Sequence, residues 1–244
     1  MKAPIGRTGG KSRLKNQLIE LFPKDYDTFV EPFVGAGNIF YSTPRVANEI
    51  INDLDTDMYI VHTGLQQDAK YINDNITREF SKIKFEESKK KNDVLNVIYK
   101  YKASFLSQGK KYNRLERNGM KIDFTLFQER LKGVIILNKN YDYVINEYDS
   151  PTTFFYLDPP YEGIKYYDND VQPKDLYKLL QGLKGKFMLS YNDSVNIREI
   201  FKEYNIIEIK TNYQSAVINK HSRNMKRIEL VITNYWNNFF IYIN

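Results

Sequence analysis

The apolar positions along the chain divide it into short hydrophobic runs and longer amphipathic stretches. Runs rich in β-branched and aromatic residues predict strands at 28–30, 46–52, 152–157, 186–191, 206–210 and 229–235. Apolar residues at helical spacing predict helices at 12–21, from about 38, from 56 to about 80, from 93 to about 105, and at 127–135, 173–183 and 195–204. A further short element is expected to begin near 143.

The alternation of these elements predicts an α/β fold with a mostly parallel sheet. The last strand, 229–235, follows 206–210 closely enough in sequence to pair antiparallel with it. The middle of the chain, about 60–145, shows no strand pattern, and residues 84–93 form a solvated charge run. We therefore expect a separate helical insert in this region.

The composition of the 244-residue chain limits its chemistry. Cysteine is absent, which excludes disulfides and thiolate metal sites. His62 and His221 are too far apart to suggest a metal cluster, and each is interpreted as an ordinary surface or helix residue. No secretory signal precedes residue 20 and no apolar run reaches transmembrane length, so an intracellular protein is expected. The net charge of +6 is compatible with a polyanionic partner.

The stretch "TTFFYLDPPY" carries a buried strand directly into an acid, two prolines and a tyrosine. Pro159 and Pro160 cannot continue a strand ladder, so the backbone is locked where the strand ends. Asp158, the proline carbonyls and the Tyr161 ring then lie at a strand's carboxyl end, where open α/β sheets bind ligands. The alternative is a structural corner with a surface acid.

The stretch "EPFVGAGNIF" places two glycines, Gly35 and Gly37, between a predicted strand and a predicted helix. Glycine lets the backbone approach a ligand in a tight turn, but the third glycine of the dinucleotide fingerprint is missing. The next predicted strand ends at Asp53, which could bond the ribose hydroxyls of a nucleoside-like cofactor. Asp55 and Asp57 compete for that role, and a solvated acid is the alternative.

The stretch "GRTGGKS" lacks the first glycine of a P-loop, because Ile5 stands at that position. Nucleotide hydrolysis is therefore not expected. Gly9, Gly10 and Lys11 remain candidates for wrapping a small ligand, and the alternative is a flexible amino-terminal arm.

These motifs occur in one order along the chain: "GGK" at 9–11, "EPFVGAG" at 31–37, "IND" at 51–53 and "DPPY" at 158–161. In that order, with "KRIELVITNY" near the end, the chain resembles the Dam-like DNA adenine-N6 methyltransferases over nearly its whole length. One departure is that Arg7 and Thr8 stand where many members carry an aromatic residue before "GGK". A stacking contact between this arm and the cofactor is therefore not expected.

The resemblance implies a Rossmann-like methyltransferase sheet, mostly parallel with an antiparallel last strand, plus a small helical target-recognition insert. It implies a catalytic domain that binds S-adenosylmethionine at 1–58 and 146–244, with the insert at 59–145. The implied cofactor-binding residues are Gly9, Gly10, Lys11, Glu31, Pro32, Phe33, Gly35, Gly37, Asp53 and Asp158.

The implied catalytic residues are Asp158, Pro159, Pro160 and Tyr161. The carboxylate and the Pro159 carbonyl would accept hydrogen bonds from the amino group of adenine, which localises the nitrogen lone pair. Tyr161 would stack on the adenine after it flips out of the duplex. Direct in-line methyl transfer then needs no metal.

Two basic stretches are candidates for contacting double-stranded DNA: residues 108–119 and 219–227. The predicted DNA-binding residues are Lys110, Lys111, Arg114, Arg117, Asn118, Lys220, Arg223, Lys226 and Arg227. Most would meet phosphates, whereas Arg114, Arg117 or Asn118 could read a base edge. For each one, a solvated surface charge is the alternative.

The expected function is adenine-N6 methylation of a short specific DNA sequence by a monomer without a membrane or metal partner. The enzyme would act in a bacterial cytoplasm, as part of restriction–modification or alone, or in the host of a virus that encodes it. One alternative is a methyltransferase acting on RNA or on a protein amide, although enzymes acting on glutamine usually begin this loop with Asn rather than Asp158. Another alternative is a catalytically silent DNA-binding module.

Overall fold

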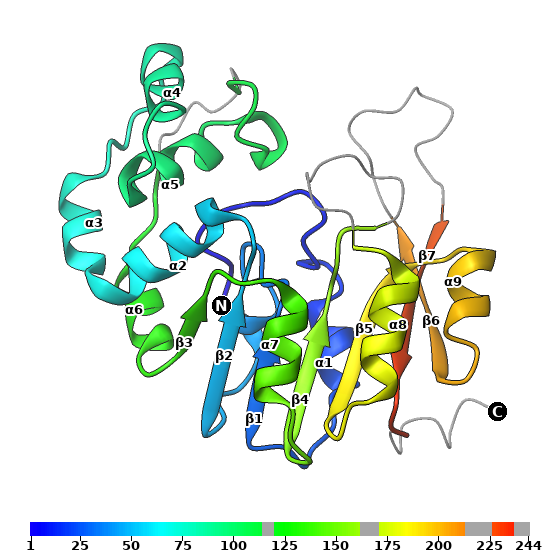
Figure 1. Ribbon diagram of the computed structural model, residues 1–244. Coiled ribbons are helices and arrows are strands. Elements are labelled where there is room, and N and C mark those ends of the chain that lie inside the picture. The colour runs from blue at the N-terminus through cyan, green and yellow to red at the C-terminus, as the bar shows by residue number, and fades with distance from the viewer. Residues whose placement is uncertain (114–119, 162–170, 213–225, 237–244) are drawn as a thin grey trace. The chain divides into compact units, whose positions relative to one another are not determined.

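The computed structural model describes residues 1–113, 120–161, 171–212 and 226–236. Its strands form a seven-stranded sheet in the order β3-β2-β1-β4-β5-β7-β6 (Figure 1). The strands are β1 (Thr28–Glu31), β2 (Asn48–Asn52), β3 (Ile135–Leu137), β4 (Thr153–Leu157), β5 (Lys186–Asn192), β6 (Asn205–Asn212) and β7 (Lys226–Thr233). The fold is α/β and Rossmann-like, as predicted, with a mostly parallel sheet and an antiparallel last strand.

Helices α2 to α6 follow one another between β2 and β3, and the chain forms two compact units. The α-helices are α1 (Lys15–Glu20), α2 (Thr56–Gln67), α3 (Ala69–Asn75), α4 (Lys82–Ser88), α5 (Val94–Lys102), α6 (Thr125–Leu131), α7 (Tyr141–Tyr148), α8 (Pro173–Gln181) and α9 (Val195–Ile200). The first unit comprises Met1–Ile19 and Phe33–Tyr141, and the second comprises Glu20–Pro32 and Asp142–Asn244. The boundaries of these two units differ from those of the predicted insert, 59–145. The insert therefore stays a prediction.

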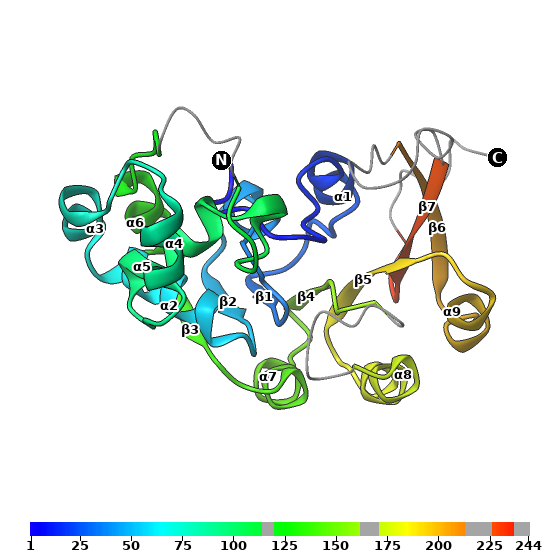
Figure 2. The same cartoon turned by 90° about the horizontal axis from the view of Figure 1, so that it is seen from above.

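The second unit is built on the parallel strands β1, β4 and β5. Strand β7 pairs antiparallel with both β5 and β6, which extends this part of the sheet. All five residues of β4 are buried, and Figure 2 shows α7, α8 and α9 along one face of these strands. A strand that is covered on both faces needs apolar residues at consecutive positions. This is why the sequence "TFFYL" predicts a strand.

The first unit joins β2 and β3 in parallel and carries helices α2 to α6. Helix α2 contributes Met58, Val61 and Leu65 to its core, all of them fully buried. The side chain of Arg130 in α6 donates two hydrogen bonds of 2.7 Å to the carboxylate of the buried Glu49 in β2. This two-pronged ion pair ties α6 to β2.

Three expectations about the first unit were wrong: the single helix from 56 to about 80, the helix from 38 and the absence of strands from the middle of the chain. The helix expected from 56 to about 80 is two helices, because the Asp68 side chain accepts the Tyr71 N–H and starts α3 anew. The charge run at 84–93 is mostly exposed, as expected, although it begins inside α4, which the Ser81 side chain caps by accepting the Lys84 N–H. Only the 3-10 turn Phe40–Ser42 forms where a helix was expected from 38, and the short strand β3 lies in the region expected to lack strands.

Among the described residues, no helix is long and apolar enough to cross a membrane. The same residues contain no group of three or more histidine, cysteine, aspartate or glutamate side chains arranged to hold a metal ion. Whether the enzyme works without a metal and as a monomer stays a prediction.

Candidate active site

The turn that follows β1 in sequence depends on two glycines in the left-handed region. Gly35 has a φ of 51° and Gly37 a φ of 81°. A Cβ at Gly37 would lie 2.7 Å from ring carbons of Tyr41, so a side chain there is excluded by contact as well as by backbone strain. The turn is tied to β2 by a 2.9 Å hydrogen bond from the Val34 N–H to the Asn52 carbonyl.

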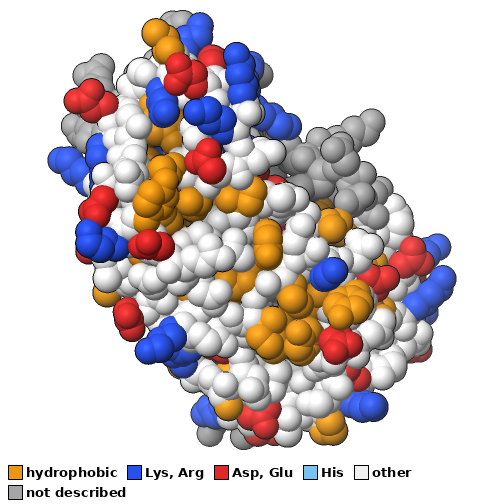
Figure 3. Space-filling view, turned by 60° about the vertical axis from the view of Figure 1, so that its left-hand side comes forward, with side chains coloured by type: hydrophobic (Ala, Val, Ile, Leu, Met, Phe, Trp, Pro, Cys, Tyr) orange, Lys and Arg blue, Asp and Glu red, His pale blue; other side chains and the backbone are white. Residues whose placement is uncertain are grey.

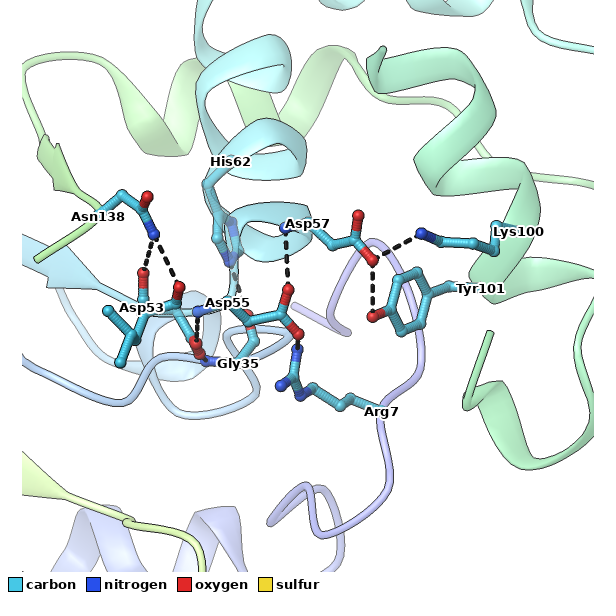
Figure 4. Close-up of polar contacts among 10 residues, drawn as sticks. Arg7, Gly35, Asp53, Asp55, Asp57, His62, Lys100, Tyr101 and Asn138 are labelled. Atoms are coloured by element: carbon cyan, nitrogen blue, oxygen red, sulfur yellow. Dashed lines mark hydrogen bonds and ion pairs between the residues drawn. The ribbon is translucent and has the colours of Figure 1, made fainter. Parts of the chain in front are cut away.

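Both polar backbone atoms of Gly35 bind side chains of the same unit (Figure 4). The Gly35 N–H donates to Asp53 Oδ2 at 2.7 Å. The Gly35 carbonyl accepts from Nε2 of His62 at 2.8 Å, while the Tyr41 hydroxyl donates to Nδ1 of the same ring at 2.9 Å. The carbonyl acceptor places a proton on Nε2, and the neutral ring then accepts the Tyr41 hydroxyl at Nδ1.

His62 is a helix residue, which was one of its two expected interpretations, but it is buried against the turn and is not a surface residue. Its side chain projects from α2 and is 1% exposed. Burial lowers the pKa of His62 to about 4, which keeps the ring uncharged at neutral pH. A single histidine within a helical stretch gives no sequence signal of this role.

The three acids that competed for the cofactor role have different partners. Asp55 caps α2 by accepting the Asp57 N–H at 2.9 Å and pairs with the guanidinium of Arg7 at 2.8 Å. Asp57 accepts from Lys100 at 2.7 Å and from the Tyr101 hydroxyl at 3.1 Å. Both carboxylates are thus engaged by side chains of other segments.

Asp53 is held differently, because the described hydrogen bonds to its carboxylate come from the backbone N–H groups of Gly35 and Asp55, at 2.7 and 2.8 Å. A carboxylate offers about four acceptor positions, and the hydrogen bonds from the described residues occupy two of them. Burial raises the pKa of Asp53, whereas the nearby Arg7 guanidinium opposes that rise. The geometry favours Asp53 over Asp55 and Asp57 as the acid that could bind a ligand beside the turn.

The amino-terminal stretch around "GGK" is ordered by contacts within the first unit. Gly9 has a φ of 86°, and the Lys11 side chain is buried at 3% exposure. A Cβ on Gly10 would lie 2.5 Å from Nδ2 of Asn38, so the stretch packs closely on the segment after the glycine turn. Arg7 approaches that turn as well, since a Cβ at Gly35 would lie 3.5 Å from its Cδ. These contacts argue against a free arm.

The "DPPY" residues lie in the second unit at the end of β4. Asp158 is partly buried, Pro159 is buried, and Pro160 and Tyr161 are partly buried. The ring of Tyr161 stacks on that of Tyr191 in β5, with centroids 5.1 Å apart and planes 25° apart. Its hydroxyl donates to the carboxylate of Glu229 in β7. Burial, together with the charges of Asp158 and Glu229, raises the pKa of Tyr161 well above its usual value.

The other predicted cofactor residues are divided between the units. Glu31 and Pro32 belong to the second unit, where Glu31 ends β1 at 2% exposure. Phe33 belongs to the first, where its ring lies 5.3 Å from that of Tyr141.

The predicted DNA-binding residues are described only in part. Lys110 and Lys111 are exposed. Arg114, Arg117, Asn118, Lys220 and Arg223 lie outside the described residues, and Lys226 and Arg227 belong to β7 without described side chains. Figure 3 shows basic and acidic side chains interspersed on the face that it presents. Their contact with DNA stays a prediction.

Comparison with known proteins identifies relatives over most of the chain. Residues 8–96 and 94–215 match the family model described as D12 class N6 adenine-specific DNA methyltransferase. The Type II methyltransferase M1.LlaDCHI of Lactococcus lactis subsp. cremoris is 26% identical over 273 residues, which cover 94% of each chain. The Type II methyltransferase M.MjaIII of Methanocaldococcus jannaschii is 27% identical over 284 residues, covering 93% of this chain and 96% of the relative. Among solved structures, a putative methyltransferase, yhhF, from Escherichia coli aligns with a TM-score of 0.46 at 9% identity, over 96% of this chain and 92% of the other.

The buried, neutral His62 predicts a specific loss of stability in acid. The pKa of His62 is about 4 in the folded chain, against about 6.5 for an unfolded histidine. Stability is therefore full above about pH 6.5 and falls as pH drops toward 4, by on the order of 3 kcal/mol from this group. His62→Gln, which keeps a side-chain N–H for Gly35 but cannot titrate, should be less sensitive to acid than the wild type.

Urea unfolding at pH 7 and pH 4.5 measures this difference. Tyr41→Phe is the matched control, because it removes the other hydrogen bond of the ring and leaves the titrating imidazole in place. Equal acid sensitivity in the wild type and in His62→Gln would contradict the assignment.

Proposed function

The chain belongs to the D12 class N6 adenine-specific DNA methyltransferase family, and we propose that its two polar clusters divide the work of methylating adenine in a specific DNA sequence. The cluster around Gly35 and Asp53 binds S-adenosylmethionine, and the cluster around Asp158 and Tyr161 binds the target adenine. The observation that carries the proposal is a carboxylate and a ring held at the end of β4, a fully buried strand that two prolines terminate.

The Gly35 cluster fits a nucleoside-like ligand for three reasons. Its glycines leave the backbone of the turn without side chains. The Asp53 carboxylate keeps acceptor positions, and ribose hydroxyls are donors that suit them. Asp55 and Asp57 are already paired with Arg7 and Lys100, so their carboxylates stabilise the fold and Asp53 is the acid assigned to the ligand.

S-adenosylmethionine supplies a methyl group that is activated by its sulfonium. Lys11 and the carbonyls near Gly10 would border the same ligand, because this stretch packs against Asn38 just beyond the turn. The roles of Glu31, Pro32 and Phe33 toward the cofactor rest on the family pattern.

The Asp158 cluster supplies what an adenine amino group needs to become a nucleophile. Its nitrogen lone pair is delocalised into the ring, and two accepted hydrogen bonds favour the pyramidal form in which the pair is localised. The Asp158 carboxylate and the Pro159 carbonyl are those acceptors, and the prolines hold the backbone so that little reorganisation remains. Tyr161 provides a face for stacking once the base has left the duplex.

The exposed Lys110 and Lys111 are proposed to contact phosphates of double-stranded DNA. Phosphate contacts add affinity by counterion release and carry no sequence information by themselves. Reading of the target sequence is assigned to Arg114, Arg117 or Asn118 on sequence grounds alone.

Asp53→Ala should weaken the binding of S-adenosylmethionine about ten- to hundredfold, since hydrogen bonds to a charged group are worth about 1.5–3 kcal/mol. Isothermal calorimetry with the cofactor measures the loss, and affinity for duplex DNA should change little. Asp57→Asn is the control, because it alters an acid of the same cluster whose carboxylate is bound by Lys100 and Tyr101. Unchanged cofactor affinity in Asp53→Ala would show that the wrong acid was chosen.

Asp158→Ala should lower turnover by on the order of a hundredfold to a thousandfold, which is the effect of losing one preorganised transition-state hydrogen bond. Single-turnover methylation of duplex DNA measures it, with cofactor and DNA affinities determined in parallel. Both affinities should be retained, because the acceptor matters most when the nitrogen becomes pyramidal. Near-normal turnover in this variant would leave the end of β4 as a structural corner only.

A further inference from the structure

Glu229 is a buried acid that the proposed chemistry does not use. It lies within β7, opposite Asn192 of β5 and Ile209 of β6, and it is 3% exposed. Acidic side chains are almost never fully buried unless they are paired, because leaving water is unfavourable for the charged form. A polar partner must therefore justify its position among the apolar residues of "IELVI".

One such partner is the hydroxyl of Tyr161, which donates a hydrogen bond to the Glu229 carboxylate. The two residues are 68 positions apart in sequence: Tyr161 lies in the segment after β4 and Glu229 lies in β7, both in the second unit. The ring of Tyr161 is also backed on one face by Tyr191, at 5.1 Å between centroids. The Tyr161 ring is thus restrained at its tip and on one face.

We propose that Glu229 is a positioning residue for the target base and acts through Tyr161. It does not touch the adenine. By holding the hydroxyl, it sets the plane of the ring so that the face turned away from Tyr191 is presented to a flipped base. This inference rests on the proposed role of Tyr161 in base stacking, and it gives a role to a residue of "KRIELVITNY" that the sequence analysis did not place at the site.

A purely structural role would be different. If Glu229 only filled the sheet, its removal would lower stability and leave the capture of a flipped base unchanged in the folded fraction. If it orients Tyr161, then Glu229→Leu and Tyr161→Phe break the same hydrogen bond from opposite ends. Their effects on base capture must then fail to add.

The experiment uses the full chain and a duplex whose methylated adenine has been mapped and replaced by 2-aminopurine, whose fluorescence reports base flipping. We expect Glu229→Leu and Tyr161→Phe each to reduce flipping and kcat/KM about tenfold, and the double variant to be no worse than either. Glu229→Gln keeps an acceptor carbonyl and should stay close to the wild type. The affinity for S-adenosylmethionine should be unchanged in all of them.

Tyr235→Phe is the matched control, because it removes another buried tyrosine hydrogen bond of the same unit, from the hydroxyl to the Leu21 carbonyl at 2.9 Å. It should leave flipping intact. Additive losses in the double variant, or full flipping in Tyr161→Phe, would overturn the proposal. If Glu229→Leu does not fold, loss of flipping in Tyr161→Phe with retention in Glu229→Gln supports the proposal, and any other pairing overturns it. A wild-type chain that methylates no adenine would instead refute the proposed adenine methylation, on which the role of Glu229 rests.

Discussion

The backbone of Gly35 is fixed at both of its polar atoms by side chains of the first unit. Its N–H is bound by Asp53 at the end of β2, and its carbonyl is bound by His62 from α2. Asp53 also accepts the Asp55 N–H, which leads directly into the cap of α2. A strand end, a glycine turn and a helix start therefore share one hydrogen-bonded network, and each constrains the position of the others.

Among the described residues, two of the three acids in this network are paired with basic side chains. Arg7 balances Asp55, and Lys100 balances Asp57. The ion pair between Asp57 and Lys100 joins the first turn of α2 to α5. A helix far along the chain therefore supports the start of α2. Asp53 is left with backbone donors among its described partners, which holds its geometry without a competing cation in direct contact. The second unit uses a different device, in which prolines, a stacked ring and a buried acid hold the residues after β4.

The sequence predicts these features unequally, for physical reasons. β4 can be predicted because a strand that is buried on both faces has apolar residues at consecutive positions, and the two prolines mark its end. His62 and Glu229 escape notice because their roles depend on which distant groups surround them. An acid inside an otherwise apolar strand, as in "IELVI", is nonetheless a signal that sequence reasoning could have used. β3 is too short to show a period, and α3 and α4 are separated from their neighbours by the capping side chains of Asp68 and Ser81 rather than by glycine or proline.

As a member of its family, this chain is expected to methylate the N6 amino group of adenine at a specific DNA sequence. The most direct test is to express the chain in a host that lacks adenine methylation and to sequence the native DNA for N6-methyladenine at single-base resolution. We expect modification of one adenine within a single short motif, at nearly every occurrence of that motif in the genome. Unmodified genomic DNA in cells that contain folded protein, or methylation found only on RNA, would contradict it.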